Sequence, residues 1–206
     1  MDSENKYNHL EELGGSDYVI VEGKPNIKGW TVKSTVGQKI GKVDELLFEA
    51  QTRKVRYLVV DLAGNELNVS KDKKILVPIG IAGLYDNGSK QADSVGTIGI
   101  AGETVLQTDQ SGVVFDNTSG STSIVYNPYD DGKVIIVPVN EGLLTMLPGY
   151  MKGNVSPDVE YYVRHVYEGT PTETIIVTDR PYNSNDFYAH EHFNYDRFYN
   201  RDRPRT

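Results

Sequence analysis

The chain has 206 residues, with 20 glycines, 9 prolines and a formal net charge of −8 at pH 7. The lack of cysteine excludes disulfide bonds, thiolate catalysis and zinc–thiolate sites. The acidic balance argues against general nucleic-acid binding, because neutralising phosphates requires clustered lysine and arginine side chains.

The beginning of the chain is polar and acidic, and it lacks the apolar stretch of a signal peptide. No apolar run approaches the roughly 18 residues that a membrane-spanning helix needs. We therefore predict a soluble, cytoplasmic protein without a membrane span. Residues 1–17 are interpreted as a flexible N-terminal arm, and residues 18–21 as a first strand.

Residues 29–62 are the stretch around which the chain is organised. Within it, residues 43–49 and 55–62 are rich in β-branched and aromatic side chains and flank a polar turn, which is typical of a β-hairpin. Just before this hairpin, Gly37 and Gly41 bracket Ile40 and suit a tight turn into a strongly twisted strand.

Residues 74–80 form a further predicted strand, in which Pro78 marks an edge, a bulge or a strand end. Residues 81–85 can continue it after a kink. Residues 88–132 are rich in Gly, Ser, Thr and Asp, and we interpret them as an inserted segment of short hairpins. Residues 133–139 repeat the Val-Pro pattern of residues 77–78, which favours two equivalent strands at sheet edges.

Two helices are predicted after this strand. Asn140 can cap a short helix over residues 141–147. The second helix has the clearer signals, since Ser156 is a candidate N-cap, Pro157 takes the first helical position and Gly169 ends the helix. Its apolar residues recur at the spacing of one helix face: Val159, Tyr162, Val163 and Val166.

The C-terminal residues 170–206 combine a short apolar run with a segment in which large rings alternate with Asn, Asp and Arg. These rings are the candidate interaction residues: Tyr182, Phe187, Tyr188, Phe193, Tyr195, Phe198 and Tyr199. Large rings with polar groups suit packing against the chain's own domain or a second subunit. Disorder and recognition of another macromolecule by stacking are the alternatives.

Metal binding and catalysis have weak signals. His190-Glu191-His192 could place two imidazoles on one side of an extended segment, but no third ligand is fixed by spacing, so we assign no metal and no cofactor. The chain has no G-x-S-x-G elbow, no P-loop and no S-x-x-K pattern. Asp44 and Glu45 point to opposite faces of a strand and are not expected to act as a coupled pair. We therefore assign no catalytic residue and predict that the protein is not an enzyme.

Residues 29–62 resemble the PRC-barrel domain family. The resemblance is carried by the pattern G-x-x-I-G-x-V-x-x-L-L at residues 37–47 and by Arg-Lys-Val-Arg-Tyr-Leu-Val-Val at residues 53–60. Residues 75–78 look like the next strand of that family. Three further pieces resemble the segment after the barrel in the photosynthetic reaction-centre H subunit: Val137-Pro138, Leu147-Pro148 and the predicted helix over residues 156–169.

The resemblance implies a mainly β fold, built on a small, strongly bent PRC-type β-barrel of five or six strands. The expected organisation is an arm at residues 1–17, a barrel-like domain at 18–169 with the β-rich insertion at about 88–132, and a C-terminal strand and aromatic tail at 170–206. One or two short helices follow the barrel. The predicted core consists of Trp30, Val32, Ile40, Val43, Leu46, Phe48, Val55, Tyr57, Leu58, Val59, Leu76 and Val77.

Members of this family act through protein contacts or RNA-linked assembly. The resemblance therefore implies a non-enzymatic interaction or scaffolding module, which we expect to form homo-oligomers and to bind an unidentified protein partner. One alternative is an RNA- or ribosome-associated factor that uses a basic face: Lys33, Lys39, Lys42, Arg53, Lys54 and Arg56. A solvated strand edge is the simpler interpretation of these charges. The other alternative is a small-ligand binder with its site between barrel and insertion.

Overall fold

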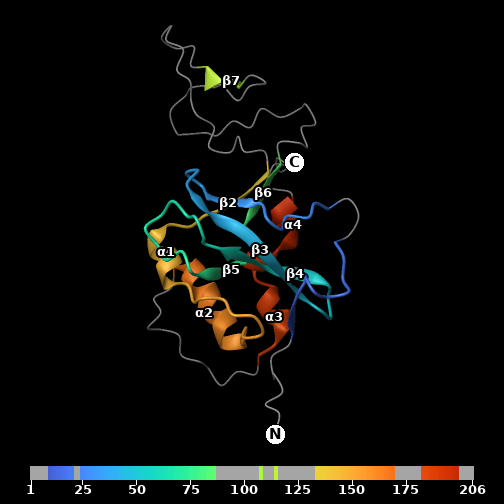
Figure 1. Ribbon diagram of the computed structural model, residues 1–206. Helices are drawn as coiled ribbons and strands as arrows, with labels where there is room; N and C mark the ends of the chain where they lie inside the picture. The colour runs from blue at the N-terminus through green and yellow to red at the C-terminus, as the bar shows by residue number, and fades with distance from the viewer. Residues whose placement is uncertain are drawn as a thin grey trace.

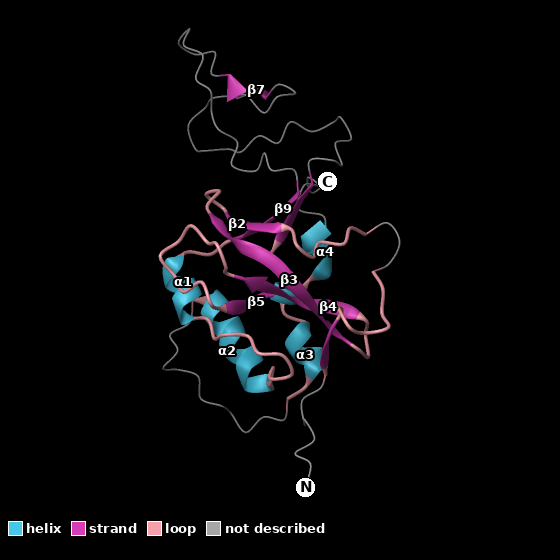
Figure 2. Ribbon diagram, viewed as in Figure 1, coloured by secondary structure: helices cyan, strands magenta, loops and turns pink. Residues whose placement is uncertain are grey.

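The structure is a computed structural model that describes residues 9–20, 24–86, 107–108, 114–115, 133–169 and 182–199. Within these residues, seven strands form one mixed sheet in the order β5-β4-β3-β2-β9-β6, with β1 also paired to β3. The strands are β1 Leu10–Glu12, β2 Thr31–Ser34, β3 Lys39–Glu49, β4 Lys54–Asp61, β5 Lys74–Pro78, β6 Gly83–Asp86 and β9 Lys133–Val137. A separate pair is formed by β7 Gln107–Thr108 and β8 Val114–Phe115. The mainly β fold is confirmed (Figure 2). The sheet has seven strands, whereas the family resemblance implies five or six.

The long strand β3 is the centre of the sheet (Figure 1). Its first residues pair with β2 and its last residues pair with β1, whereas β4 pairs along its other side. The register of β3 against β4 shifts between Val43 and Glu45 and again between Leu47 and Phe48. Such irregularities bend and twist a strand, which lets β3 serve two partners on one side.

The β3–β4 hairpin and β5 contribute a large group of side chains to the hydrophobic core, which also includes residues of α1, α2 and the tail. Strand β4 is buried from Arg56 to Val60, and its apolar run over residues 57–60 is typical of a strand covered on both faces. The predicted core is confirmed except for Val55, which is only partly buried.

Helices α1 (Glu141–Met146) and α2 (Pro157–Glu168) are confirmed with the predicted caps. Asn140 accepts a hydrogen bond from Leu143 N, and Ser156 accepts one from Val159 N. The segment that carries them covers the edge strand β5, because Tyr150 N donates to Lys74 O (2.7 Å). No helix among the described residues is long and apolar enough to span a membrane.

The N-terminal part of the sheet differs from the prediction. Residues 18–20 form no strand, and residue 21 lies outside the described residues. Instead, β1 lies within the predicted arm, where Leu10 and Leu13 pack against the core. The bent strand β3 offers these residues a pairing edge, which local sequence patterns do not reveal.

The predicted equivalence of the two Val-Pro strands is wrong. Strand β5 is an edge strand, but β9 lies inside the sheet between β2 and β6. Pro138 follows the last residue of β9, so its missing N–H removes no hydrogen bond from the ladder. Residues 83–86 pair with β9 and do not continue β5. Most of the predicted insertion and the apolar run at 174–178 lie outside the described residues.

The aromatic tail folds into three short helical segments, which the sequence analysis did not predict. They are α3 Ser184–Tyr188, the 3-10 helix η3 Glu191–Phe193 and α4 Tyr195–Tyr199. Helix α4 contacts β6 and β4, so the end of the tail returns to the sheet (Figure 1).

Candidate functional site

The aromatic rings of the tail pack within the chain itself. Phe187, Tyr188, Phe193 and Phe198 are buried in the core, and Tyr182 and Tyr195 pack against it while remaining partly exposed. The ring of Phe193 meets that of Tyr57 edge-on, with 5.2 Å between centroids. The side chain of Tyr199 lies outside the described residues. Packing against the chain's own domain is therefore what the structure shows for this segment.

Glu160 is the polar centre of this packing. This fully buried carboxylate of α2 accepts hydrogen bonds from the hydroxyls of Tyr188 (2.6 Å) and Tyr182 (2.8 Å), and His9 Nε2 lies 2.6 Å away. Burial, followed by the nearby negative charge of Glu160, raises the pKa of both tyrosines well above the ordinary value. Both hydroxyls therefore stay protonated and donate to the carboxylate.

Glu160 was not among the predicted site residues, since an acidic residue in the first turn of a helix is usually explained by the helix dipole. The signal that could have found it is its spacing. Glu160 lies three residues before Val163 and six before Val166, and these three residues form the buried face of α2.

The six residues of the predicted basic face do not share one solvent-facing surface. Lys33 and Arg56 are buried, whereas Lys42, Arg53 and Lys54 are exposed and Lys39 is partly exposed. This division reduces the positive charge available to a phosphate backbone.

Arg56 has an internal structural role. Its Nη2 donates to Glu49 Oε2 (2.6 Å), and its guanidinium lies 4.2 Å from the ring centroid of Tyr188. Burial alone would raise the pKa of Glu49, but hydrogen bonds from Thr52 and Arg56 outweigh it and hold that pKa below the ordinary value. Arg56, held by Glu49 within the β3–β4 hairpin, thus links the hairpin to the tail through the ring of Tyr188.

Asp44 and Glu45 bind different partners. Asp44 pairs with Lys74 (2.8 Å), while the buried Glu45 accepts from Lys28 Nζ (2.6 Å) and from Gly14 N (3.1 Å). Burial would raise the pKa of Glu45, but these hydrogen bonds, with one from Leu46 N, hold it below the ordinary value. Both carboxylates serve as structural ties between segments.

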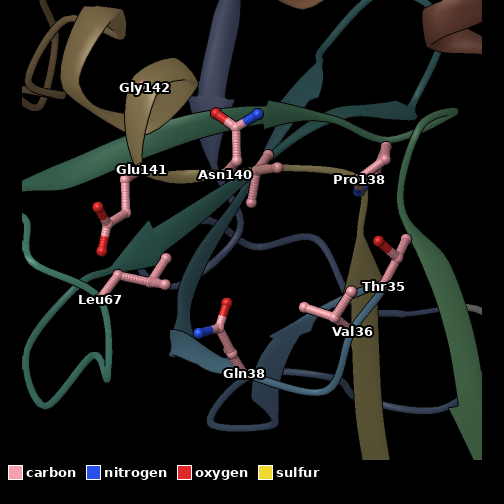
Figure 3. Close-up of a pocket in the computed structure, with 9 residues that line it drawn as sticks. Thr35, Val36, Gln38, Leu67, Pro138, Asn140, Glu141 and Gly142 are labelled. Carbon is pink, nitrogen blue, oxygen red and sulfur yellow. The ribbon is translucent and has the colours of Figure 1, made fainter.

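A surface hollow of about 580 Å³ lies between the β2–β3 turn, the loop after β4 and the start of α1. We call it the α1 groove. Its lining residues are Thr35, Val36, Gln38, Leu67, Pro138, Val139, Asn140, Glu141 and Gly142. Figure 3 shows Val36 and Leu67 on opposite sides of the groove with their side chains pointing toward one another.

Hydrogen bonds within the chain hold both walls of the α1 groove. In the β2–β3 turn, Ser34 N donates to Gln38 O (2.8 Å) and Gly37 N donates to Ser34 O (2.9 Å), with Gly37 at a φ of 86° that favours glycine. On the facing wall, the Asn140 side chain caps α1 and Glu141 Oε1 accepts from Asn68 N (2.9 Å). These polar groups are engaged within the chain, while the apolar side chain of Val36 remains 73% exposed.

The two histidines of the His190-Glu191-His192 segment meet a third group from another element. Side-chain donor atoms of Glu168, His190 and His192 all lie within 4.8 Å of one another. The carboxylate inside the sequence motif is directed elsewhere, because Glu191 Oε2 pairs with Arg197 Nη1 (2.8 Å). The third ligand that the sequence did not fix is thus provided by the end of α2.

Comparison with protein families gives one match, the PRC-barrel domain at residues 20–96. The matched segment includes β2 to β6, and with them the bent strand β3 and its hairpin with β4. No curated protein matches the chain. The family match and the mainly β sheet agree with the resemblance of residues 29–62. The chain therefore contains a domain of the PRC-barrel family.

Proposed function

We propose that the protein is a soluble, cytoplasmic, non-enzymatic interaction module that self-associates through the α1 groove. The observation that carries this proposal is the exposed Val36 on a hydrogen-bonded turn beside an open groove. Binding to a surface that is already ordered costs little conformational entropy. The protein would then act as a scaffold by bringing copies of its barrel together.

The chain supplies apolar side chains that can fill such a groove in another copy. Besides Val36, the exposed large apolar side chains include Met146 at 49% and Met151 at 62% exposure. Methionine adapts its shape to irregular surfaces and is common at interaction sites. Burying these side chains between copies removes apolar surface from water, which is the main driving force for association.

The test compares two exposed valines in the full chain. Val36→Glu places a charge at the groove, whereas Val19→Glu adds the same charge at a valine that is 87% exposed and outside the groove lining. Sedimentation equilibrium should show an oligomer for the wild type and for Val19→Glu, and at least tenfold weaker association for Val36→Glu. Equal association of both variants would assign the interface to another surface.

A monomeric wild type at every concentration would contradict self-association. Affinity purification from the native cell, with Val36→Glu as the control bait, then tests the interaction role itself. A partner retained by the wild type and lost by Val36→Glu would assign the groove to a different protein. A partner retained equally by both baits would contradict the proposed role of the groove.

A further inference from the structure

We propose that Glu168, His190 and His192 form a binding site for a divalent transition-metal ion of the zinc type. The donor atoms of the three side chains converge within 4.8 Å, and they come from two elements that are distant in sequence. This site is separate from the α1 groove and goes beyond the interaction role.

The backbone holds both sides of the site in place. Glu168 is the last residue of α2, directly before the Gly169 cap. On the other side, His192 O accepts a hydrogen bond from Gly80 N (2.7 Å), and the neighbouring Phe193 is buried in the core. The two histidines are therefore presented by a segment that is fixed to the sheet.

The distances suit a small ion. His190 Nε2 lies 3.3 Å from Glu168 Oε1, and the ring centroids of His190 and His192 are 4.5 Å apart. Zinc bound tetrahedrally, with its ligands at 2.0–2.1 Å, separates neighbouring donor atoms by about 3.4 Å. The first pair already has this separation, and the His192 donor atom lies within 4.8 Å of both.

The donor set points to the class of metal. Two imidazoles and one carboxylate are characteristic ligands of zinc and of other late divalent transition metals, and they leave coordination positions for water. His192 Nδ1 is buried and has no hydrogen-bond partner among the described residues. Such a group in a folded protein calls for an explanation, and a bound ion or its hydration shell supplies one.

The ion has to compete with groups that already face these ligands. Arg164 Nε lies 3.2 Å from Glu168 Oε1, and His165 Nδ1 lies 3.2 Å from Glu168 Oε2. His190 Nδ1 also accepts a long hydrogen bond from His192 N (3.3 Å), which is lost when the ring proton moves to Nδ1 on metal binding at Nε2. These contacts lower the affinity but leave Glu168 and His190 accessible from solvent.

A bound metal would fasten the tail to α2. Because the ligands converge only in the folded chain, the ion binds this state preferentially and stabilises it. The expected result is one zinc ion per chain and slower amide hydrogen exchange at residues 190–193 when zinc is present.

The experiment titrates Zn²⁺ into the metal-free full chain by calorimetry and compares two carboxylate variants. Glu168→Gln removes a proposed ligand, and Glu191→Gln removes the carboxylate between the two histidines, which pairs with Arg197. Loss of an outer-sphere partner alone weakens metal binding about 10–100-fold. We therefore expect Glu168→Gln to weaken binding more than tenfold and Glu191→Gln to change it by about twofold at most.

His190→Asn is the second ligand variant, and melting in the presence of EDTA shows whether each variant is folded. A folded Glu168→Gln or His190→Asn variant that binds zinc as tightly as the wild type would overturn the proposal. Absence of zinc binding by the wild type would overturn it as well. Loss of binding in Glu191→Gln but not in Glu168→Gln would place the metal on the tail alone.

Discussion

The β3–β4 hairpin and the C-terminal tail are both buried, but different forces hold them. The hairpin combines backbone hydrogen bonds along its ladder with apolar side chains such as Leu46, Leu58 and Val59. The tail has no strand pairing with the sheet among the described residues, and the tyrosines among its rings carry hydroxyl groups that need hydrogen-bond partners. The hairpin is therefore stabilised mainly by apolar burial, whereas docking of the tail also depends on a few directional contacts.

The difference matters because buried polar groups are costly unless every partner is in place. Glu160 loses its hydration on burial, and the hydroxyls of Tyr182 and Tyr188 offset this cost. Arg56 is likewise buried between Glu49 and the ring of Tyr188. We infer that the tail can be released by one substitution while the barrel strands stay folded.

The largest expected effect comes from Gly41→Ala in the hairpin. A Cβ atom at this position would overlap the carbonyl oxygen of Asp61, which belongs to the backbone of the neighbouring strand β4. Because the ladder itself must shift, we expect the free energy of unfolding to fall by about 4 kcal/mol or more. Chemical denaturation followed by circular dichroism measures this loss.

Gly142→Ala is the matched control. Its Cβ would meet only Asn140 Oδ1 at 3.4 Å, and alanine favours the helix α1 more than glycine does. We expect this variant to be as stable as the wild type or more stable by up to about 1 kcal/mol. Equal destabilisation by Gly41→Ala and Gly142→Ala would contradict the steric argument.

The second prediction applies the same change where the tail meets the sheet. A Cβ on Gly80 would lie 2.5 Å from Glu191 O and 2.7 Å from both His192 O and Asn194 N. These atoms belong to the tail backbone, which can move away as a unit. We expect Gly80→Ala to cost about 3 kcal/mol of tail docking, measured as faster amide exchange at residues 184–199 with protection of β3 and β4 retained. Loss of protection in β3 and β4 to the same extent would show that the tail and the barrel are one cooperative unit.

The two regions also differ in how much the sequence predicted. Residues 43–49 and 55–62 reveal the hairpin because their apolar pattern and turn are local, and the same residues carry the family pattern. The α1 and α2 boundaries are equally local, since Asn140, Ser156 and Gly169 act within one helical turn. In contrast, β1 forms because β3 bends, which is a property of the assembled sheet.

The interior position of β9 and the role of Glu160 could not be predicted for a similar reason. Whether β9 is an edge strand depends on β6, which pairs with it from a distant part of the sequence. Glu160 is buried because the tail supplies two hydroxyl donors from residues more than 20 positions away. The contact of Glu168 with His190 could not be predicted either, because it forms only after the tail has docked. Polar sites formed between distant segments are thus the features of this molecule that sequence patterns do not predict.

The smallest predicted effect isolates one hydrogen bond of the tail. Tyr188→Phe keeps the buried ring but removes the hydroxyl that donates to Glu160 Oε1 at 2.6 Å. Hydrogen bonds to a buried charged group contribute about 1.5–3 kcal/mol, so we expect a loss of about 2 kcal/mol in the free energy of unfolding. Urea denaturation of the full chain measures it.

Tyr162→Phe is the matched control, because the Tyr162 hydroxyl donates to Met146 O (3.1 Å) at an exposed position. Water replaces that bond, so its loss should cost less than about 1 kcal/mol. Comparing the two variants distinguishes hydrogen bonding to Glu160 from apolar packing of the rings as the main force that holds the tail. If Tyr188→Phe costs no more than Tyr162→Phe, apolar packing of the rings is sufficient and the Glu160 network is not a main stabilising contact. A larger loss of unfolding free energy in Tyr188→Phe than in Tyr162→Phe means that docking of the tail depends on directional hydrogen bonds. Breaking these hydrogen bonds is then how the tail detaches from the barrel.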